Sequence, residues 1–141
     1  MKKIAFLFPG QGSQYVGMGR KFIEGYEEAR KIFQQASKIL GFDLEELCNH
    51  GPEEELKKTA NAQPALLTVN WIFTRILKDR GIEPTVVAGH SLGEYSAVLC
   101  AEVVKYSAAV RLVRRRAQFM EEASAALDGA MAAVIGLPRE I

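Results

Sequence analysis

The chain has 141 residues, of which 48% are hydrophobic and 25% are charged, and its formal net charge is +1. These values are typical of one globular domain with a substantial core. The near-neutral charge argues against nucleic-acid binding as the main activity. The two cysteines, Cys48 and Cys100, belong to no C-x-x-C motif or His/Cys cluster. We therefore expect a reducing compartment and no metal site.

The first apolar run is too short for a targeting or membrane segment. It covers residues 4–8 and ends at Pro9, whereas a signal-peptide core needs roughly 7–15 apolar residues. No run approaches the roughly 20 apolar residues of a membrane helix. These features predict a cytoplasmic protein that does not bind membranes.

The first half of the chain predicts a strand, a loop and a helix. Residues 4–8 are continuously apolar, which favours a strand buried on both faces of a parallel sheet. Residues 10–19 hold four glycines and predict a loop that enters a helix. Apolar residues then recur at helical spacing over 22–40, with Gly25 as a point of interruption, and Gly41 stands at the expected C-terminal cap.

The second half predicts further alternation of helices and strands. Residues 51–60 are charged and predict a solvated connector, and Pro64 is expected in the first turn of a helix that is apolar on nearly all sides. Ser107 is expected to cap a long helix. The remaining predicted elements are a strand at 85–88, a helix at 91–100, the long helix to about 127 and a strand at 129–137. Such alternation indicates an α/β layered fold.

Gly89-His90-Ser91-Leu92-Gly93 matches the pattern G-x-S-x-G between a predicted strand and a predicted helix. In this context the serine is a candidate nucleophile on a tight, strained turn, and both glycines are needed where neighbouring backbone leaves no room for a Cβ. The N–H of Leu92 at the helix start is a candidate oxyanion donor. The alternative is a glycine-lined turn with a capping serine.

A second oxyanion donor is expected from the loop after the first strand, residues 8–14, because open α/β sheets bind ligands at that edge. The loop fits neither nucleotide motif. G-x-G-x-x-G fails at Tyr15, and the P-loop pattern fails at Met18 and Gly19. An oxyanion or substrate loop is therefore favoured, with a simple tight turn as the alternative.

Arg116 lies within the apolar stripe of the helix that follows Ser107, if residues advance by about 100° each. A guanidinium directed at a core needs a carboxylate or phosphate partner, and its fork suits a carboxylate. We expect Arg116 to bind an acidic substrate beside Ser91. A structural ion pair or a snorkelling arginine is the alternative, and Arg114 and Arg115 are expected to be surface charges.

No base for Ser91 can be assigned, although a serine nucleophile needs one. His90 adjoins Ser91, but successive side chains diverge on such a turn. His50 lies in a polar connector, where a surface role is expected.

Five motifs in this order resemble the bacterial malonyl-CoA:acyl carrier protein transacylases and the related acyltransferase domains of fatty acid and polyketide synthases. The motifs are FPGQGSQ at 8–14, AQPALLT at 62–68, GHSLGEYSA at 89–97, RLVRRRAQFM at 111–120 and GAMAAVIGL at 129–137. The resemblance implies an α/β-hydrolase-like parallel sheet with flanking helices at 1–128. It also implies the first strand of a truncated, ferredoxin-like small subdomain at 129–141.

The resemblance further implies transfer of malonyl from malonyl-CoA, through a serine ester, to the phosphopantetheine thiol of acyl carrier protein. Ser91 would be the nucleophile, and Gln11 and Leu92 would supply oxyanion N–H groups. Arg116 would pair with the malonyl carboxylate, Gln63 would line the site and His90 would shape the pocket. No cofactor is implied beyond the phosphopantetheine that the partner carries.

Family members run to about twice this length, and their catalytic histidine lies in the second half. We therefore expect an N-terminal fragment that does not turn over alone. Two other functions remain open: a serine hydrolase or thioesterase, and a non-catalytic fragment that binds CoA or acyl carrier protein.

Overall fold

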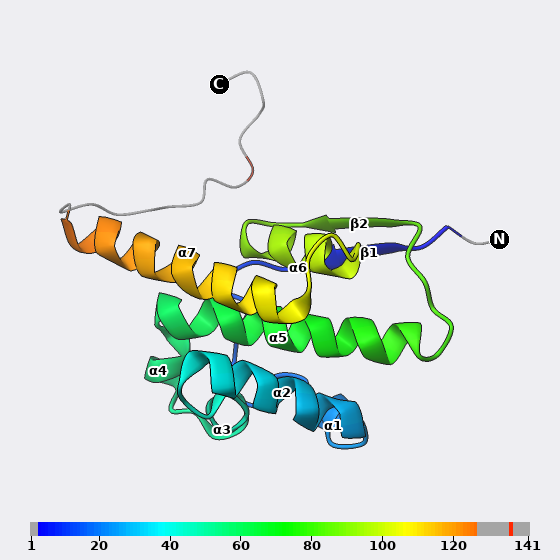
Figure 1. Ribbon diagram of the computed structural model, residues 1–141, viewed down its shortest axis with the longest axis horizontal. Coiled ribbons are helices and arrows are strands. Elements are labelled where there is room, and N and C mark those ends of the chain that lie inside the picture. Colours follow the sequence, from blue (N-terminus) through cyan, green and yellow to red (C-terminus); the bar gives the residue numbers. More distant parts are fainter. Residues whose placement is uncertain (1–2, 127–135, 137–141) are drawn as a thin grey trace.

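The computed structural model of the protein describes residues 3–126 and Gly136 (Figure 1). Within these residues two parallel strands and their flanking helices form an α/β arrangement, which confirms the predicted class. The elements in chain order are β1 (Ala5–Phe8), α1 (Arg20–Ile23), α2 (Glu27–Leu40), α3 (Leu44–His50), α4 (Glu53–Lys57), α5 (Thr59–Lys78), β2 (Val86–Gly89), α6 (Leu92–Cys100) and α7 (Tyr106–Ala126).

The two strands place two loops at one edge of the sheet. β1 and β2 are parallel, with Ala5 opposite Val86 and Phe8 opposite Gly89. Since both strands end at the same level, the loop after Phe8 and the turn after Gly89 leave the sheet side by side. This edge is where open α/β sheets carry their ligand sites.

Only one face of the sheet is covered within the described residues. Phe6 and Phe8 are buried against Ala97 and Cys100 of α6. Leu7, on the other face of β1, is 76% exposed. The expectation of a strand buried on both faces is therefore wrong here, because α6 packs against one face and no described element covers the other.

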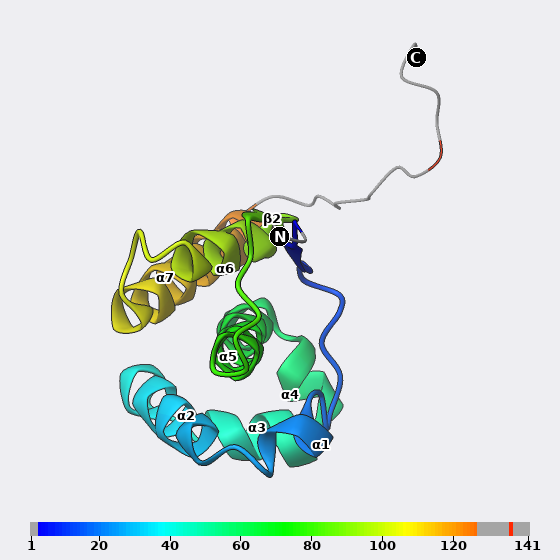
Figure 2. The same ribbon diagram turned by 90° about the vertical axis from the view of Figure 1, so that its right-hand side faces the viewer.

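Helix α5 runs through the middle of the helical layer, as the end-on view in Figure 2 shows. Helices α6 and α7 pack on one side of it, and α2 and α4 contact it from the other. Apolar side chains all round α5 are buried, which confirms the prediction of a helix covered on more than one side. They include Ala62, Leu66, Leu67, Val69, Ile72 and Ile76.

Two predicted helix starts are wrong. Helix α5 begins at Thr59, so Pro64 lies inside the helix and not in its first turn. Helix α7 begins at Tyr106, which places Ser107 within the first turn and not at the cap. In both cases the helix extends upstream of the residue expected to start it.

The first helical segment is divided as Gly25 suggested, with α1 ending at Ile23 and α2 beginning at Glu27. Gly41 caps α2 in the left-handed region, with φ of 83°, and its N–H donates to the Ser37 carbonyl. Helix α3 was not predicted. The sequence feature that marks its start is the N-cap residue Asp43, whose carboxylate accepts a hydrogen bond of 3.0 Å from the Glu46 N–H.

Two buried groups titrate far from their usual range. Burial raises the pKa of the Cys48 thiol to about 12. Burial also raises the pKa of Tyr106, whose hydroxyl lies 2.9 Å from Thr68 Oγ1 in the core. Both cysteines are free and buried.

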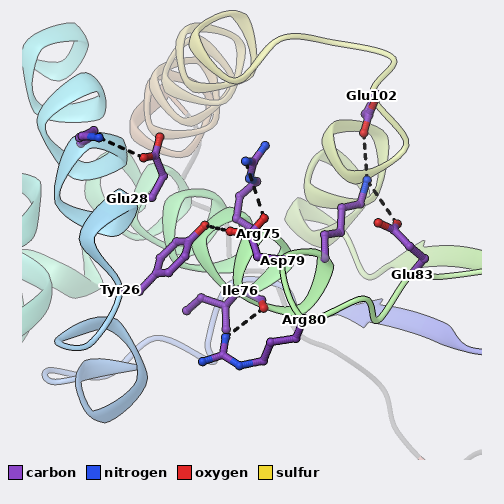
Figure 3. Close-up of polar contacts among 10 residues, drawn as sticks. Tyr26, Glu28, Arg75, Ile76, Asp79, Arg80, Glu83 and Glu102 are labelled. Atoms are coloured by element: carbon purple, nitrogen blue, oxygen red, sulfur yellow. Dashed lines mark hydrogen bonds and ion pairs between the residues drawn. The ribbon is translucent and has the colours of Figure 1, made fainter.

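Exposed and partly buried polar contacts surround the C-terminal end of α5 (Figure 3). The Tyr26 hydroxyl donates to Asp79 Oδ2, and the Arg80 guanidinium donates to the Ile76 carbonyl at 3.0 Å. Lys78 Nζ donates to Glu102 Oε1 at 3.0 Å. That contact raises the pKa of Lys78 and lowers the pKa of Glu102.

Among the described helices, none is both long and apolar enough to cross a bilayer. The strand predicted at 129–137 and the domain boundary at 128/129 lie outside the described residues, Gly136 apart.

Candidate active site

Ser91 occupies a strained turn between β2 and α6. Its backbone φ is 52° and its ψ is −107°, and Glu102 is the only other described non-glycine residue with a positive φ. A side chain held in such a region costs about 1–3 kcal/mol and persists only where surrounding structure enforces it. The side chain of Ser91 is nevertheless exposed to solvent, so the hydroxyl is accessible.

The two glycines of the motif enforce this turn by close backbone contact. A Cβ on Gly89 would lie 2.0 Å from the carbonyl carbon of Gly93, and a Cβ on Gly93 would lie 2.1 Å from the carbonyl oxygen of Phe8. Neither position has room for a side chain. Helix α6 therefore packs directly on β1 and β2, and Ser91 is raised above the edge of the sheet.

Two backbone amides at this edge of the sheet are free within the described residues. Helix α6 starts at Leu92, whose N–H is one of the unpaired donors of a helix N-terminus. The loop after β1 brings Gln11 to the same edge, and the His90 N–H donates to the Phe8 carbonyl at 3.0 Å. In the part of the chain that the structure describes, the N–H groups of Leu92 and Gln11 donate no hydrogen bond.

The Gln11 side chain is held by helix α5. Its Nε2 donates to Thr59 Oγ1 at 3.1 Å, and its Oε1 accepts from Gln63 Nε2 at 3.2 Å. Gln63 is fully buried and also approaches the Met120 sulfur of α7 at 3.2 Å. Gln63 thus connects three elements around the site. Thr59 and Met120 were not predicted as members of this network.

Arg116 reaches Ser91 from α7. Its Nη2 donates to Ser91 Oγ at 3.1 Å, and its Cζ lies 5.4 Å from the centre of the Tyr95 ring. The arginine predicted to stand beside the serine is therefore in hydrogen-bonding contact with it. A cation at this distance can hold a negative group that is bound next to the hydroxyl.

The prediction that Arg116 is directed at the core is wrong. The buried face of α7 consists of Tyr106, Ala109, Val110, Val113 and Ala117. Arg116 itself is only partly buried, and Leu112 and Phe119 are about half exposed, at 52% and 53%. The apolar residues of α7 spread over two faces, of which one packs on the core. The other lies open beside Ser91.

This second face of α7 borders an apolar groove next to Ser91. Arg115 stacks over Phe119, with its Cζ 4.3 Å from the ring centre. The residues that line the groove are Tyr95, Leu112, Arg115, Arg116, Phe119, Met120 and Ala123. Its cationic end and apolar wall suit a ligand that carries both a negative group and apolar parts.

Arg114 was predicted to be a surface charge, but it is partly buried. Its Nη1 donates to the Ala60 carbonyl of α5 at 2.9 Å, in a partly buried contact. The expectation failed because this side of α7 lies against the start of α5, which partly buries Arg114.

Neither histidine contacts Ser91 within the described residues. His90 is exposed, and a Cβ on Gly10 would lie 2.9 Å from its Nδ1, so its ring packs on the Gly10 loop. His50 ends α3 and pairs with Glu46 Oε2 at 2.9 Å, both side chains being largely exposed. The described residues thus bring a serine and a cation into contact, with two free amides at the same edge of the sheet and no histidine in contact with the serine.

The chain is also similar to known proteins. The acyl transferase domain family matches residues 5–140. A malonyl CoA-acyl carrier protein transacylase of Bacillus subtilis is 49% identical over 140 residues, which cover 99% of this chain and 44% of that protein. The chain therefore spans less than half the length of this relative.

Solved structures of similar proteins share this fold. An acyl carrier protein S-malonyltransferase from Vibrio cholerae superposes with a TM-score of 0.83 at 46% identity, covering 86% of this chain and 40% of that one. A malonyl-transacylase in complex with its type II polyketide synthase acyl carrier protein gives 0.83 at 45% identity, with the same coverage. With the family match extending over nearly all its residues, the chain belongs to the acyl transferase domain family.

Proposed function

We propose that this chain is part of a malonyltransferase that moves a malonyl group from malonyl-CoA to the thiol of an acyl carrier protein. The observation that carries the proposal is the contact of 3.1 Å between Arg116 Nη2 and Ser91 Oγ. In a malonyl thioester a single methylene separates the carboxylate from the reacting carbonyl carbon. A guanidinium beside the nucleophile is therefore close enough to hold the carboxylate while Ser91 attacks.

The proposed reaction has two steps. The Ser91 oxygen attacks the thioester carbonyl carbon, its proton passes to a general base, and the C–S bond breaks to release the CoA thiolate, which is then protonated. The thiol of the carrier protein next attacks the serine ester, gives up its proton, and takes the malonyl group as the serine recovers its own proton. Both tetrahedral intermediates carry an oxyanion, for which the N–H groups of Leu92 and Gln11 are the proposed donors.

The general base is proposed to come from a segment outside this sequence, since neither His50 nor His90 contacts Ser91 in the described residues. We also propose a finer assignment of the fold. Residues 1–128 would form part of an α/β-hydrolase-like subdomain, and 129–141 would begin a ferredoxin-like one. The resemblance to relatives about twice as long supports both points. The free cysteines, Cys48 and Cys100, accord with a cytoplasmic location.

A hydrolase or thioesterase of neutral acyl groups is a weaker candidate. The substrate of such an enzyme has no carboxylate for Arg116 to bind. A cation in contact with the serine would therefore not increase its affinity for the substrate. A fragment that only binds CoA would not need the strained backbone of Ser91.

The proposal is tested by calorimetric titration of the chain with malonyl-CoA and with acetyl-CoA. Arg116→Ala should weaken malonyl-CoA binding roughly tenfold, the worth of one hydrogen bond to a charged group, and should leave acetyl-CoA binding within about twofold. Arg111→Ala is the matched control, because Arg111 is an exposed arginine of the same helix. Equal losses for both ligands, or no loss, would contradict the carboxylate role.

A further inference from the structure

Pro64 creates a local defect in helix α5. It is the sixth residue of the helix that begins at Thr59. In a regular helix the N–H of residue 64 would donate to the carbonyl of Ala60, four residues earlier, but proline has no N–H. The Ala60 carbonyl therefore needs a donor from elsewhere.

Helix α7 supplies that donor and a second contact to the same residue. Arg114 Nη1 donates to the Ala60 carbonyl at 2.9 Å, and Glu121 Oε1 accepts from the Ala60 N–H at 2.8 Å. Arg114 and Glu121 are seven residues apart and so lie on one face of α7, two turns from each other. Both backbone groups of Ala60 are thus held by charged side chains of another helix.

The contacts continue from Ala60 to the candidate oxyanion loop. Thr59, the neighbour of Ala60, accepts a hydrogen bond from the Gln11 side chain, and Gln63 in the next turn donates to Gln11. On another face of α7, Arg116 donates to Ser91. One helix therefore reaches both sides of the site, directly through Arg116 and indirectly through Ala60.

We propose that Arg114 is a positioning residue of this site. Its guanidinium replaces the hydrogen-bond donor that Pro64 lacks, and together with Glu121 it fixes the first turns of α5 against α7. This fixes Gln11 relative to Ser91 and Arg116. This inference deepens the proposed function. The effect of Arg114 on malonyl-CoA binding rests on that function. The contact between the two helices is independent of that function.

The test uses Pro64→Ala, because alanine at this position restores the helical donor to Ala60. We expect Arg114→Ala to shift the backbone and side-chain NMR signals of Gln11 and to raise the malonyl-CoA dissociation constant about fivefold, the scale of one hydrogen bond. In the Pro64→Ala background the same substitution should leave the Gln11 signals in place and change the dissociation constant by less than about twofold. Arg111→Ala again controls for loss of a positive charge on α7.

Each outcome is decisive. Loss of affinity and of the Gln11 position with Arg114→Ala, both rescued by Pro64→Ala, supports the proposal. Equal effects in the two backgrounds, or unmoved Gln11 signals, overturn it. If Arg114→Ala does not fold, the doubly substituted chain must fold, and its failure to do so also overturns the proposal. If the unchanged chain binds no malonyl-CoA, the proposed function fails while the Gln11 signals still test the role of Arg114.

Discussion

The two ends of the molecule are stabilised by different kinds of contact. At the site end, which comprises the carboxyl ends of β1 and β2 and the first turns of α5, backbones touch through glycines. Partly buried hydrogen bonds also join side chains there to distant segments. At the opposite end, around the C-terminus of α5, exposed ion pairs and hydrogen bonds predominate (Figure 3).

This difference matches what each end has to do. Exposed ion pairs each contribute little to stability and tolerate change. The contacts at the site end hold Ser91 in an unfavourable conformation and keep Arg116 within reach of it, which requires rigid surroundings. Substitutions should therefore have large effects at the site end and small ones at the opposite end.

The largest effect is expected from Gly93→Ala. The new methyl group would lie 2.1 Å from the backbone oxygen of Phe8, so α6 and β1 would have to separate. We expect a loss of unfolding free energy of roughly 3 kcal/mol or more in urea denaturation. Gly25→Ala is the control, because a Cβ there meets nothing within 4 Å. Similar stabilities of the two variants would show that the close approach is not structurally important.

A smaller effect of opposite sign is expected from Ser91→Gly. Glycine adopts a positive φ without strain, so the relief of about 1–3 kcal/mol should exceed its own entropic cost of about 0.5–1 kcal/mol. We expect the free energy of unfolding to rise by about 1 kcal/mol while the nucleophile is lost. Ser107→Gly, in the first turn of α7, should lower it. A destabilised Ser91→Gly would contradict the assignment of strain to this turn.

The smallest effect is expected at the opposite end from Tyr26→Phe. This change removes the exposed hydrogen bond to Asp79 and should cost about 0.5 kcal/mol. Malonyl-CoA binding, measured by calorimetry, should stay unchanged. A clear loss of affinity would mean that the two ends are coupled and that exposed contacts far from the site do affect it.

The sequence was most informative where local chemistry decides the structure. The glycines around Ser91 and the glycine cap at Gly41 were predictable because one residue type fits each backbone conformation. The placement of Arg116 beside Ser91 agreed with prediction although the burial argument for it was wrong, since helical periodicity does not tell which apolar face meets the core.

Features that depend on long-range packing were missed. Arg114 and Ala60, which it pairs with, are 54 residues apart in the sequence. Only the observed start of α5 at Thr59 shows that Pro64 leaves the Ala60 carbonyl without a donor from its own helix. The exposed Leu7 face could not be foreseen from an apolar run, because the run does not specify what covers the sheet. Short α3 was missed because seven residues carry little periodic signal.

The most direct test of the central claim is to observe the Arg116 side chain by NMR while ligand is added. We expect the Nε–Hε signal of Arg116 to shift strongly with malonyl-CoA and little with acetyl-CoA, while the signal of Arg111 stays in place with both. An Arg116 signal that does not respond to malonyl-CoA, or responds equally to both thioesters, would contradict recognition of the carboxylate beside Ser91.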